Sequence, residues 1–388
     1  MRILFVNYEY PPLGGGGGAV NAWLAEELAR RHEVTVLTSG AFNLADREVA
    51  NDVEIIRSRT FFRRQMAVAN LPSMASFIVG GARAGRELLA KRQFDVINTH
   101  FALPTGPVGL SMARSCRLPN VLSVHGGDLY DPSKWMSPHR HALLRTVVRR
   151  IVACADAVVG QSHNTNDNLC RYYHPPRPPY LIPLGIPRPP AATMGRTELG
   201  LAGNEFVMTT IGRLVARKGI DQLITMLSHL PGDAVRLVVI GDGPDLLPLK
   251  EQAARLRLAS RVTFTGFVSD QQKVNWLANS DIYVSTSQHE GFGLVFLEAM
   301  AQGLPIVCYD HGGQTDFLAS GVNGAVLPLN DLEAFTRAVA ELEADGGKRH
   351  AIAQRNLADV EHYFIDRCAA RYQELFESVT ERRRGGVA

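Results

Sequence analysis

The strongest constraint on the fold is an alternation of short apolar runs with amphipathic stretches of helical period. The apolar runs are rich in valine, leucine and isoleucine, as expected for strands that are buried on both faces. This pattern predicts an α/β fold of doubly wound, mostly parallel sheets with helices on both faces. The predicted strands are Ile3–Asn7, Val34–Thr38, Val53–Ile56, Val96–Asn98, Val121–Val124, Ala157–Val159, Phe206–Ile211, Arg236–Ile240, Val262–Phe264, Ile282–Ser285, Ile306–Tyr309 and Ala325–Leu327.

Two proline-rich segments interrupt the alternation near the middle of the chain. They are Pro175–Pro179 and Ile186–Pro190, and such segments suit a stiff hinge or linker. The length of 388 residues also fits two domains. We therefore expect two Rossmann-like domains, residues 1–185 and 186–367, facing a cleft, because ligands of such sheets bind at the carboxyl ends of the strands.

Charge is divided unevenly between the two halves. Residues 1–190 contain 22 Lys and Arg against 14 Asp and Glu, whereas the remainder is acidic. No lysine-rich tract or aromatic-interleaved basic motif is present, which argues against nucleic acid. An anionic membrane or substrate fits better. The segment His139–Cys154 has four arginines among apolar residues: Arg140, Arg145, Arg149 and Arg150. This pattern fits an amphipathic helix that binds a membrane, and it equally fits an ordinary helix whose apolar face packs in the core.

The apolar runs are far shorter than the ~20 residues that a membrane-spanning helix needs. The chain reads as a strand directly after Met1, so we expect no signal peptide. The cysteines are single, and no CxxC pair occurs, which predicts buried thiols in a reducing cytoplasm rather than a disulfide framework or zinc site. They are Cys116, Cys154, Cys170, Cys308 and Cys368.

A run of five glycines, Gly14 to Gly18, follows the first predicted strand and precedes a helix predicted over Ala19–Arg31. Glycine lets the backbone approach a ligand closely, and a helix N-terminus favours anions. A dinucleotide site is one interpretation, but the second strand has no acidic residue placed to hold a ribose. There are two other interpretations: a loop that closes on substrate, formed by Gly15, Gly16, Gly17 and Gly18, or a purely structural turn.

Three loops of the second half carry candidate ligand-binding residues. Arg213 and Lys218 follow the strand Phe206–Ile211 and are suited to phosphate oxygens, although a solvated basic loop is the alternative. Gly241-Asp242-Gly243-Pro244 forms a tight turn before a helix. Gly266, Phe267 and Val268 offer a backbone edge and an aromatic ring for a base, with ordinary loop packing as the alternative.

The richest segment is His289–Met300, which follows the strand Ile282–Ser285. Gly291 and Gly293 free the backbone ahead of a helix. Glu290 precedes that helix, and Glu298 lies on its otherwise apolar sequence, where an isolated carboxylate is costly without hydrogen-bond partners. Sugar or ribose hydroxyls would supply such partners, and a structural salt bridge is the other interpretation.

These residues together resemble the retaining glycosyltransferases of the GT-B fold, family four. The resemblance spans nearly the whole chain and is most specific in Glu290-x7-Glu298, within His-Glu-Gly-Phe-Gly-Leu and Leu-Glu-Ala-Met-Ala-Gln-Gly-Leu-Pro. Gly212-Arg213, Lys218-Gly219 and Gly241–Pro244 stand at the family's spacing upstream. The resemblance implies an acceptor site on the N-terminal domain, a nucleotide-sugar site on the C-terminal domain, and a C-terminal helix from about residue 368 that crosses back to the first domain.

The family also implies roles for individual residues. Arg213 and Lys218 would hold the diphosphate, Glu298 the ribose, and Glu290 the donor sugar. The backbone of Gly291, Phe292, Gly293 and Leu294 would lie near the phosphate and sugar, and Phe267 and Val268 would flank the base. His125, in Val124-His125-Gly126-Gly127-Asp128, matches the family histidine of the reaction centre, and Asp128 is a weaker candidate for acceptor contact.

The sequence departs from the family pattern at two places. The hinge Ile182–Pro187 lacks the usual Asn before Gly185, and Asp316 stands where Glu is common. No Asp-x-Asp motif occurs, so we expect metal-independent catalysis in which Arg213, Lys218 and helix N-termini neutralise the diphosphate. The family implies retention, and we expect a same-face substitution through an oxocarbenium-like state because the sequence shows no obvious nucleophile.

The predicted enzyme is a hexosyltransferase that uses a UDP- or GDP-linked sugar and needs no cofactor. The hydroxyl acceptor would be a lipid-linked saccharide, a polysaccharide precursor or a small molecule in cell-envelope glycan, glycolipid or natural-product biosynthesis. The protein would be cytoplasmic, with peripheral contact to the inner face of the membrane as a further expectation. The alternatives are a nucleotide-sugar epimerase of the same fold and a non-catalytic nucleotide-sugar-binding protein.

Overall fold

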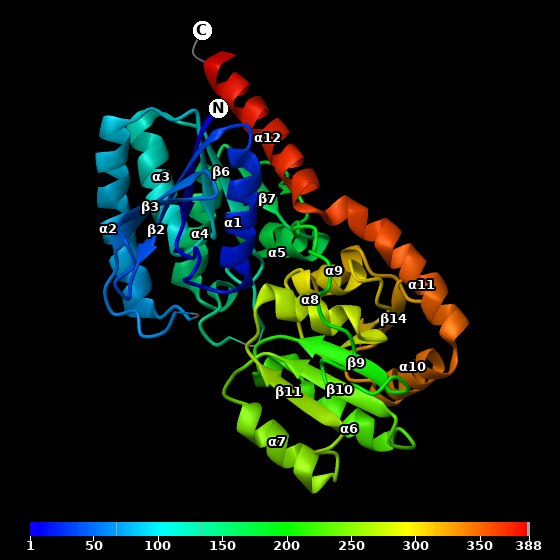
Figure 1. Ribbon diagram of the computed structural model, residues 1–388. Helices are drawn as coiled ribbons and strands as arrows, with labels where there is room; N and C mark the ends of the chain where they lie inside the picture. The colour runs from blue at the N-terminus through cyan, green and yellow to red at the C-terminus, as the bar shows by residue number, and fades with distance from the viewer. Residues whose placement is uncertain (67, 133, 386–388) are drawn as a thin grey trace. The chain divides into compact units, whose positions relative to one another are not determined.

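A computed structural model describes residues 1–66, 68–132 and 134–385 (Figure 1). The chain divides into two compact units. The first contains residues 1–187 and the C-terminal segment from Phe364, and the second contains residues 188–363. The sequence placed the corresponding boundaries after residues 185 and 367.

The first unit is built on an eight-stranded sheet in the order β3-β4-β2-β1-β5-β6-β7-β8. All neighbouring strands are parallel except β3 and β4. The strands are β1 (Arg2–Asn7), β2 (Glu33–Gly40), β3 (Arg47–Ala50), β4 (Val53–Arg59), β5 (Val96–His100), β6 (Asn120–Val124), β7 (Ala157–Gly160) and β8 (Tyr180–Leu181). Buried apolar side chains such as Leu4, Phe5 and Val6 point alternately to the two faces of β1, so both faces need cover.

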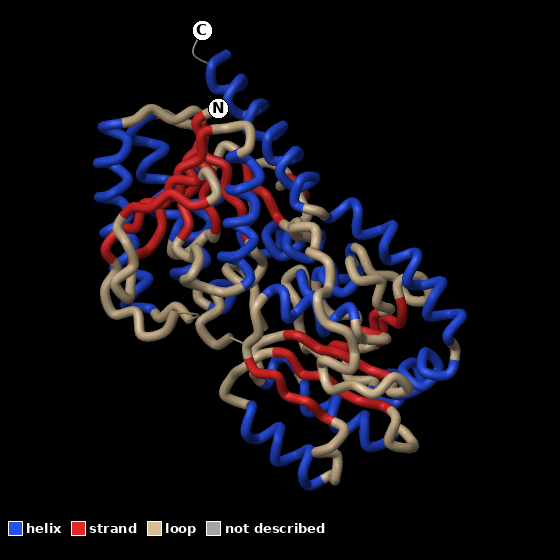
Figure 2. The backbone as a smooth tube through the Cα atoms, viewed as in Figure 1, coloured by secondary structure: helices blue, strands red, loops and turns tan. Residues whose placement is uncertain are grey.

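Helices cover both faces of this sheet, as the tube view shows (Figure 2). On one face pack α1 (Gly16–Ala29) and the C-terminal helix α12 (Ile365–Gly385). The other face carries α2 (Leu71–Lys91), α3 (Thr105–Cys116), α4 (Ala142–Cys154) and α5 (His163–Tyr173), and a short 3₁₀ turn, η1 (Pro138–Arg140), precedes α4. The return of the C-terminal helix to the first unit is confirmed.

The second unit contains a six-stranded parallel sheet in the order β11-β10-β9-β12-β13-β14. The strands are β9 (Phe206–Ile211), β10 (Val235–Ile240), β11 (Val262–Gly266), β12 (Ile282–Ser285), β13 (Ile306–Tyr309) and β14 (Gly324–Leu327). The helices are α6 (Ile220–His229), α7 (Leu246–Arg255), α8 (Asp270–Ala278), α9 (Leu294–Met300), α10 (Leu332–Ala344) and α11 (Gly346–Asp359), and the 3₁₀ turns are η2 (Ala216–Lys218), η3 (Gly313–Asp316) and η4 (Val360–Tyr363). Two Rossmann-like α/β units are therefore confirmed.

Several local expectations were wrong. The glycines from Gly16 form the first turn of α1, not a loop ahead of a helix at Ala19. Pro175–Pro179 is no linker between units, because it precedes β8 inside the first unit. Three of the five thiols, Cys116, Cys154 and Cys170, are exposed, and only Cys308 and Cys368 are buried.

Helix α4 uses its apolar face for the core of the first unit. Val148, Ile151 and Val152 are buried there, and Leu143 is the large apolar residue that α4 leaves exposed. Arg149 donates to the carbonyl of Tyr172. The core interpretation of His139–Cys154 therefore holds. Among the described residues, no helix combines the length and the apolar character that a bilayer crossing demands.

Candidate functional site

The candidate residues of the second unit lie beyond the carboxyl ends of its central strands. The order of the strands in the sheet reverses direction between β9 and β12. From β9 the chain continues to β10 and β11 on one side, and then to β12, β13 and β14 on the other side of β9. A reversal of this kind leaves a crevice for a ligand. Arg213 and Lys218 follow β9, and Glu290 follows β12, so both sides of the reversal contribute charged residues.

Lys218 and Glu290 form a buried ion pair across this reversal. The Lys218 side chain passes over Gly212, where an added Cβ would lie 3.2 Å from Lys218 Cε. Burial on its own would raise the pKa of Glu290, but the charges of Lys218 and Arg217 lower it below its ordinary value. Arg213, on the same loop, is exposed and has no ion-pair partner among the residues that the structure describes. The loop thus carries two cations held in place, Lys218 on Glu290 and Arg217 on the carbonyl of His289 at 2.7 Å, and one exposed cation, Arg213.

Glu298 is the second buried carboxylate, and it pairs with a residue that the sequence did not single out. Lys273 on α8 donates to Glu298 Oε1 at 2.7 Å and also lies 3.1 Å from Asp270. Burial raises the pKa of Glu298, against the opposing charge of Lys273. The salt-bridge interpretation is therefore correct, and the bond to Lys273 engages one carboxylate oxygen, Oε1.

The remaining donor candidates divide into exposed and packed residues. Phe267 is 89 % exposed after β11, so its ring is available for stacking, whereas Val268 packs against the core. Gly293 has φ +94° and precedes α9, where an added Cβ would clash with Phe296. Phe292 is buried against Phe317, so its side chain serves packing.

In the first unit, the glycine run lies at the corresponding reversal of strand order, between β1 and β5. Gly14 has φ +102° and donates its N–H to the carbonyl of Met66 at 2.9 Å. Gly17 packs beneath Phe101, whose Cζ would lie 2.7 Å from an added Cβ. These close approaches explain why glycine stands at both positions. Burial raises the pKa of the Glu9 carboxyl, which accepts the Gly15 N–H at 3.4 Å.

A hydrogen-bonded chain that begins on the C-terminal helix reaches His125. Tyr372 donates to Ser123, whose hydroxyl also accepts from the amide of Asn98. Asn98 Oδ1 lies 2.6 Å from His100 Nε2, and His100 Nδ1 lies 3.1 Å from His125 Nε2. The chain therefore connects α12, β6 and β5 to His125.

This chain fixes the tautomers of both histidines. The Asn98 amide nitrogen donates to the Val121 carbonyl, so Oδ1 must accept from His100 Nε2–H. Burial lowers the pKa of His100 well below its usual range and the pKa of His125 to about 4, so both rings are neutral at pH 7. His100 Nδ1 then accepts from His125 Nε2–H. This assignment leaves His125 Nδ1 as the acceptor atom of that ring, and the side chain of Gln161 is a further partner that acts to raise the pKa of His125.

Asp128 braces the loop that carries His125. Its two carboxylate oxygens accept the backbone N–H groups of Ala102 at 2.6 Å and His125 at 2.9 Å. Burial raises the pKa of Asp128, and these hydrogen bonds oppose that shift. Asp128 therefore positions His125 and Phe101, and the contact with an acceptor expected from sequence stays a prediction.

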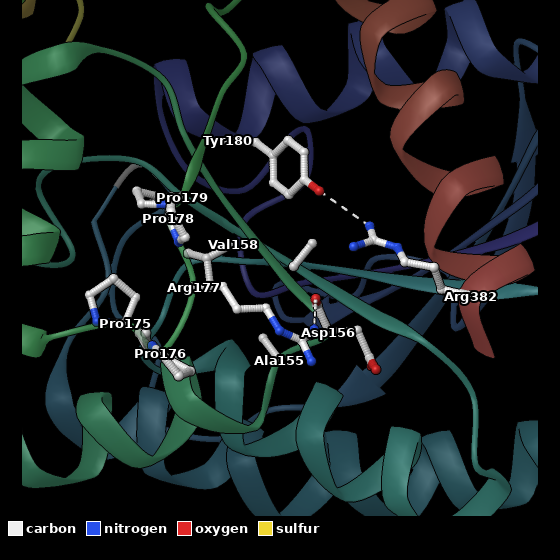
Figure 3. Close-up of a pocket in the computed structure, with 12 residues that line it drawn as sticks. Ala155, Asp156, Val158, Pro175, Pro176, Arg177, Pro178, Pro179, Tyr180 and Arg382 are labelled. Carbon is white, nitrogen blue, oxygen red and sulfur yellow. Dashed lines mark hydrogen bonds between the residues drawn. The ribbon is translucent and has the colours of Figure 1, made fainter. Parts of the chain in front are cut away.

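A cavity of about 460 Å³ lies elsewhere in the first unit, beside the proline segment (Figure 3). Pro175 to Pro179, Tyr180 and Arg382 line it, and Arg382 donates to the Tyr180 hydroxyl at 3.2 Å. Ala157, the first residue of β7, also lines it, so the cavity lies at the amino end of that strand. Ligands of parallel sheets bind at the opposite end. We assign no function to this cavity.

Comparison with known proteins identifies the family. The description Glycosyltransferase Family 4 matches residues 14–188, and Glycosyl transferases group 1 matches residues 195–358. The chain belongs to the group 1, family 4 glycosyltransferases. This glycosyltransferase is 29 % identical to a GDP-mannose-dependent alpha-(1-6)-phosphatidylinositol monomannoside mannosyltransferase of Mycolicibacterium smegmatis, over 88 % of this chain and 89 % of the relative.

Solved structures confirm the GT-B fold of the glycosyltransferase. Sucrose-phosphate synthase from Thermosynechococcus elongatus superposes with a TM-score of 0.84 at 20 % identity, covering 98 % of this chain and 100 % of the other. HepE of Anabaena in complex with UDP-glucose has a TM-score of 0.77 at 22 % identity, covering 97 % and 100 %. Both agree with the two Rossmann-like units.

Sequence reasoning missed the residues that hold the candidates in place. His100 and Asn98 lie in β5, and the family resemblance that singled out His125 named neither of them. Lys273 carried no such signal, because a lysine on a predicted helix is usually solvated. Its contact with Glu298 depends on the packing of α8 beside α9.

Proposed function

We propose that this glycosyltransferase moves a hexose from a UDP- or GDP-linked sugar to a hydroxyl acceptor, with retention at the anomeric carbon and without a divalent ion. The single observation that carries the proposal is the loop after β9. There Lys218 is held against Glu290, while Arg213 is exposed and has no ion-pair partner in the part of the chain that the structure describes. Two cations at the carboxyl end of a central strand fit a diphosphate, since cations placed at developing charge stabilise a leaving group.

The donor would occupy the second unit. Glu298 would accept hydrogen bonds from the ribose hydroxyls, and Phe267 and Val268 would flank the base beside Gly266. Glu290 and the backbone of Gly291–Leu294 would contact the donor sugar and the phosphate next to it. The exposure of Phe267 supports its role, and the Lys273 bond to Oε1 alone is compatible with a ribose contact at Glu298.

The acceptor would occupy the first unit, near the glycine run and His125. In the proposed step, the acceptor oxygen forms a bond to the anomeric carbon while the bond from that carbon to the phosphate oxygen breaks on the same face. The hydroxyl proton passes to the departing phosphate oxygen, giving the glycoside and a nucleoside diphosphate. Because His125 is neutral, its contribution would be a hydrogen bond to sugar or acceptor and not a positive charge.

The relatives guide the choice of acceptor. The mycobacterial relative is named for a phosphatidylinositol monomannoside, and a streptococcal relative, 25 % identical over 84 % of this chain, is an alpha-monoglucosyldiacylglycerol synthase. We propose a glycolipid or other cell-envelope acceptor and a cytoplasmic protein in peripheral contact with the inner membrane face. The basic first half supports that contact.

A panel of UDP- and GDP-sugars tests the donor site by thermal stabilisation in the presence of EDTA. One donor should raise the melting temperature, since a ligand at a hundredfold excess over Kd stabilises by about 2.7 kcal/mol. Release of nucleoside diphosphate should require a hydroxyl acceptor. Interconversion of sugars without an acceptor would favour the epimerase, and binding without any release would favour the non-catalytic protein.

A further inference from the structure

The segment between β4 and α2 exposes large apolar side chains to water. Phe61 is 60 % exposed, Phe62 71 % and Met66 43 %, and Leu71 in the first turn of α2 is 59 % exposed. Single exposed apolar residues are common, but four within eleven residues form a candidate interaction segment. Two of the four are neighbouring phenylalanines with ring centroids 6.3 Å apart.

The backbone around these side chains is held in place, so their exposure is built into the fold. Arg63 is buried, stacks over the Tyr8 ring at 5.1 Å and donates to the Met66 carbonyl at 2.8 Å. The Asn70 amide donates to the Phe62 carbonyl at 2.8 Å, and Ser76 accepts the Phe61 N–H at 2.9 Å. One arginine therefore folds inward and anchors the segment while the phenylalanines point to solvent.

The conformation of Phe62 adds an independent observation. Its φ is +67°, in the left-handed region, where a bulky residue costs on the order of 1 kcal/mol or more. Asparagine or glycine would relieve that strain. Apart from its ring contact with Phe61, the exposed Phe62 side chain gives the isolated fold little in return for that strain, which is consistent with a contact outside the fold.

The charge around the aromatic residues is uniformly positive in sequence. Residues 55–86 contain six arginines and no aspartate or glutamate. Arg59 and Arg64 are exposed and have no ion-pair partner within the described part of the chain. Apolar side chains beside unpaired cations are complementary to a lipid surface with anionic headgroups, because arginine attracts the headgroups and phenylalanine enters the apolar boundary.

We propose that this aromatic–arginine surface (Arg59, Phe61, Phe62, Arg64, Met66 and Leu71) docks the protein on an anionic lipid bilayer. The proposal deepens the proposed function, because it assigns the membrane contact to a surface and favours a lipid-linked acceptor. The same segment contacts the glycine run of the candidate acceptor site, because the Met66 carbonyl accepts hydrogen bonds from the Arg63 guanidinium and from the Gly14 N–H. Helix α4, the candidate from sequence, uses its apolar face for the core and exposes Leu143 instead.

Two matched double variants test the assignment. Phe62→Ser with Arg64→Glu removes one exposed apolar side chain and inverts one exposed arginine of the surface. Leu143→Ser with Arg150→Glu makes the same changes on α4, where Leu143 is 76 % exposed. Binding is measured by co-sedimentation with vesicles of equal parts phosphatidylglycerol and phosphatidylcholine at low salt, without donor. Thermal stabilisation by the donor is measured in parallel, so a failure of docking and a failure of the proposed activity are told apart.

The wild type should bind these vesicles, and the Phe62/Arg64 variant should bind roughly tenfold more weakly, since one arginine near an anionic surface contributes about fivefold. The α4 variant should bind nearly as the wild type does. Binding should be weak to phosphatidylcholine alone, and it should fall at about 0.5 M salt because exposed charges are screened. Phe62→Asn should bind more weakly while melting at a higher temperature, a combination that general unfolding cannot produce. Absence of wild-type binding, or an equal loss in the α4 variant, would overturn the proposal.

Discussion

Removal of the Lys218 ammonium tests how the second unit holds its buried carboxylate. Glu290 is only 8 % exposed in the wild type. Lys218→Met removes the cation paired with this carboxylate, while Arg217 remains as the other charge that lowers its pKa. Breaking a buried ion pair from one side costs about 3–5 kcal/mol. Because Arg217 remains, we expect a cost at the lower end of this range, so the free energy of unfolding should fall by about 3 kcal/mol.

The pH dependence of that loss follows from the pKa of Glu290. In the wild type this pKa lies below its ordinary value of 4.5, so the pair stabilises the fold above that pH and loses its effect as the pH falls through the folded-state pKa. In Lys218→Met, burial would raise the pKa of Glu290, so the destabilisation is full at neutral pH and fades toward acid. The difference between variant and wild type should therefore shrink as the pH is lowered from 7 toward about 4.

Urea unfolding followed by the fluorescence of Trp276 measures this loss in the second unit. Trp276 is the tryptophan of that unit, so Trp23 and Trp135 are replaced by Phe in all proteins compared. The control is Lys348→Met, which breaks an exposed pair with Glu341 and should cost less than about 1 kcal/mol. A loss in Lys218→Met no larger than in the control, or one independent of pH, would show that Lys218 does not stabilise the buried charge of Glu290.

Three further variants probe the individual contacts. Phe267→Ser should leave stability unchanged, because the ring is exposed, but should weaken nucleotide binding about 5- to 30-fold by calorimetry if the ring stacks on the base. Glu298→Ala should weaken binding of UDP or GDP by about tenfold or more, since hydrogen bonds to charged groups contribute about 1.5–3 kcal/mol, and unchanged affinity would remove the ribose contact. His100→Phe leaves Asn98 Oδ1 unpaired and should cost about 1–3 kcal/mol of stability. Nitrogen-15 NMR should then show His125 losing its single Nε2–H tautomer, and an unchanged spectrum would contradict the hydrogen-bonded chain.

The buried strands were predictable because their sequence signal is local. Phe206–Ile211, Ile282–Ser285 and Ile306–Tyr309 were predicted with the bounds that the structure shows. The strand Arg47–Ala50 was missed because it is an exposed edge strand with no apolar run. Tyr180–Leu181 was missed because it is two residues long and follows prolines.

The glycine run shows where sequence signals mislead. Five glycines suggest flexibility, yet the glycines from Gly16 form a helical turn. An added Cβ would lie 2.7 Å from Phe101 Cζ at Gly17, and 3.2–3.3 Å from the carbonyl oxygens of Leu13 and Glu9 at Gly18, so this turn packs tightly. Such close packing involves residues far apart in sequence, and no local pattern announces it. The partner of Glu298 was unpredictable for the same reason, although the need for a partner was evident from its apolar surroundings.

A crystal structure of the protein with UDP or GDP, grown in the presence of EDTA, tests the central claim most directly. We expect the diphosphate within hydrogen-bonding distance of Arg213 and Lys218, the ribose hydroxyls on Glu298 and the base beside Phe267. A nucleotide bound instead at the glycine run of the first unit, or no nucleotide bound without a divalent ion, would contradict this donor site.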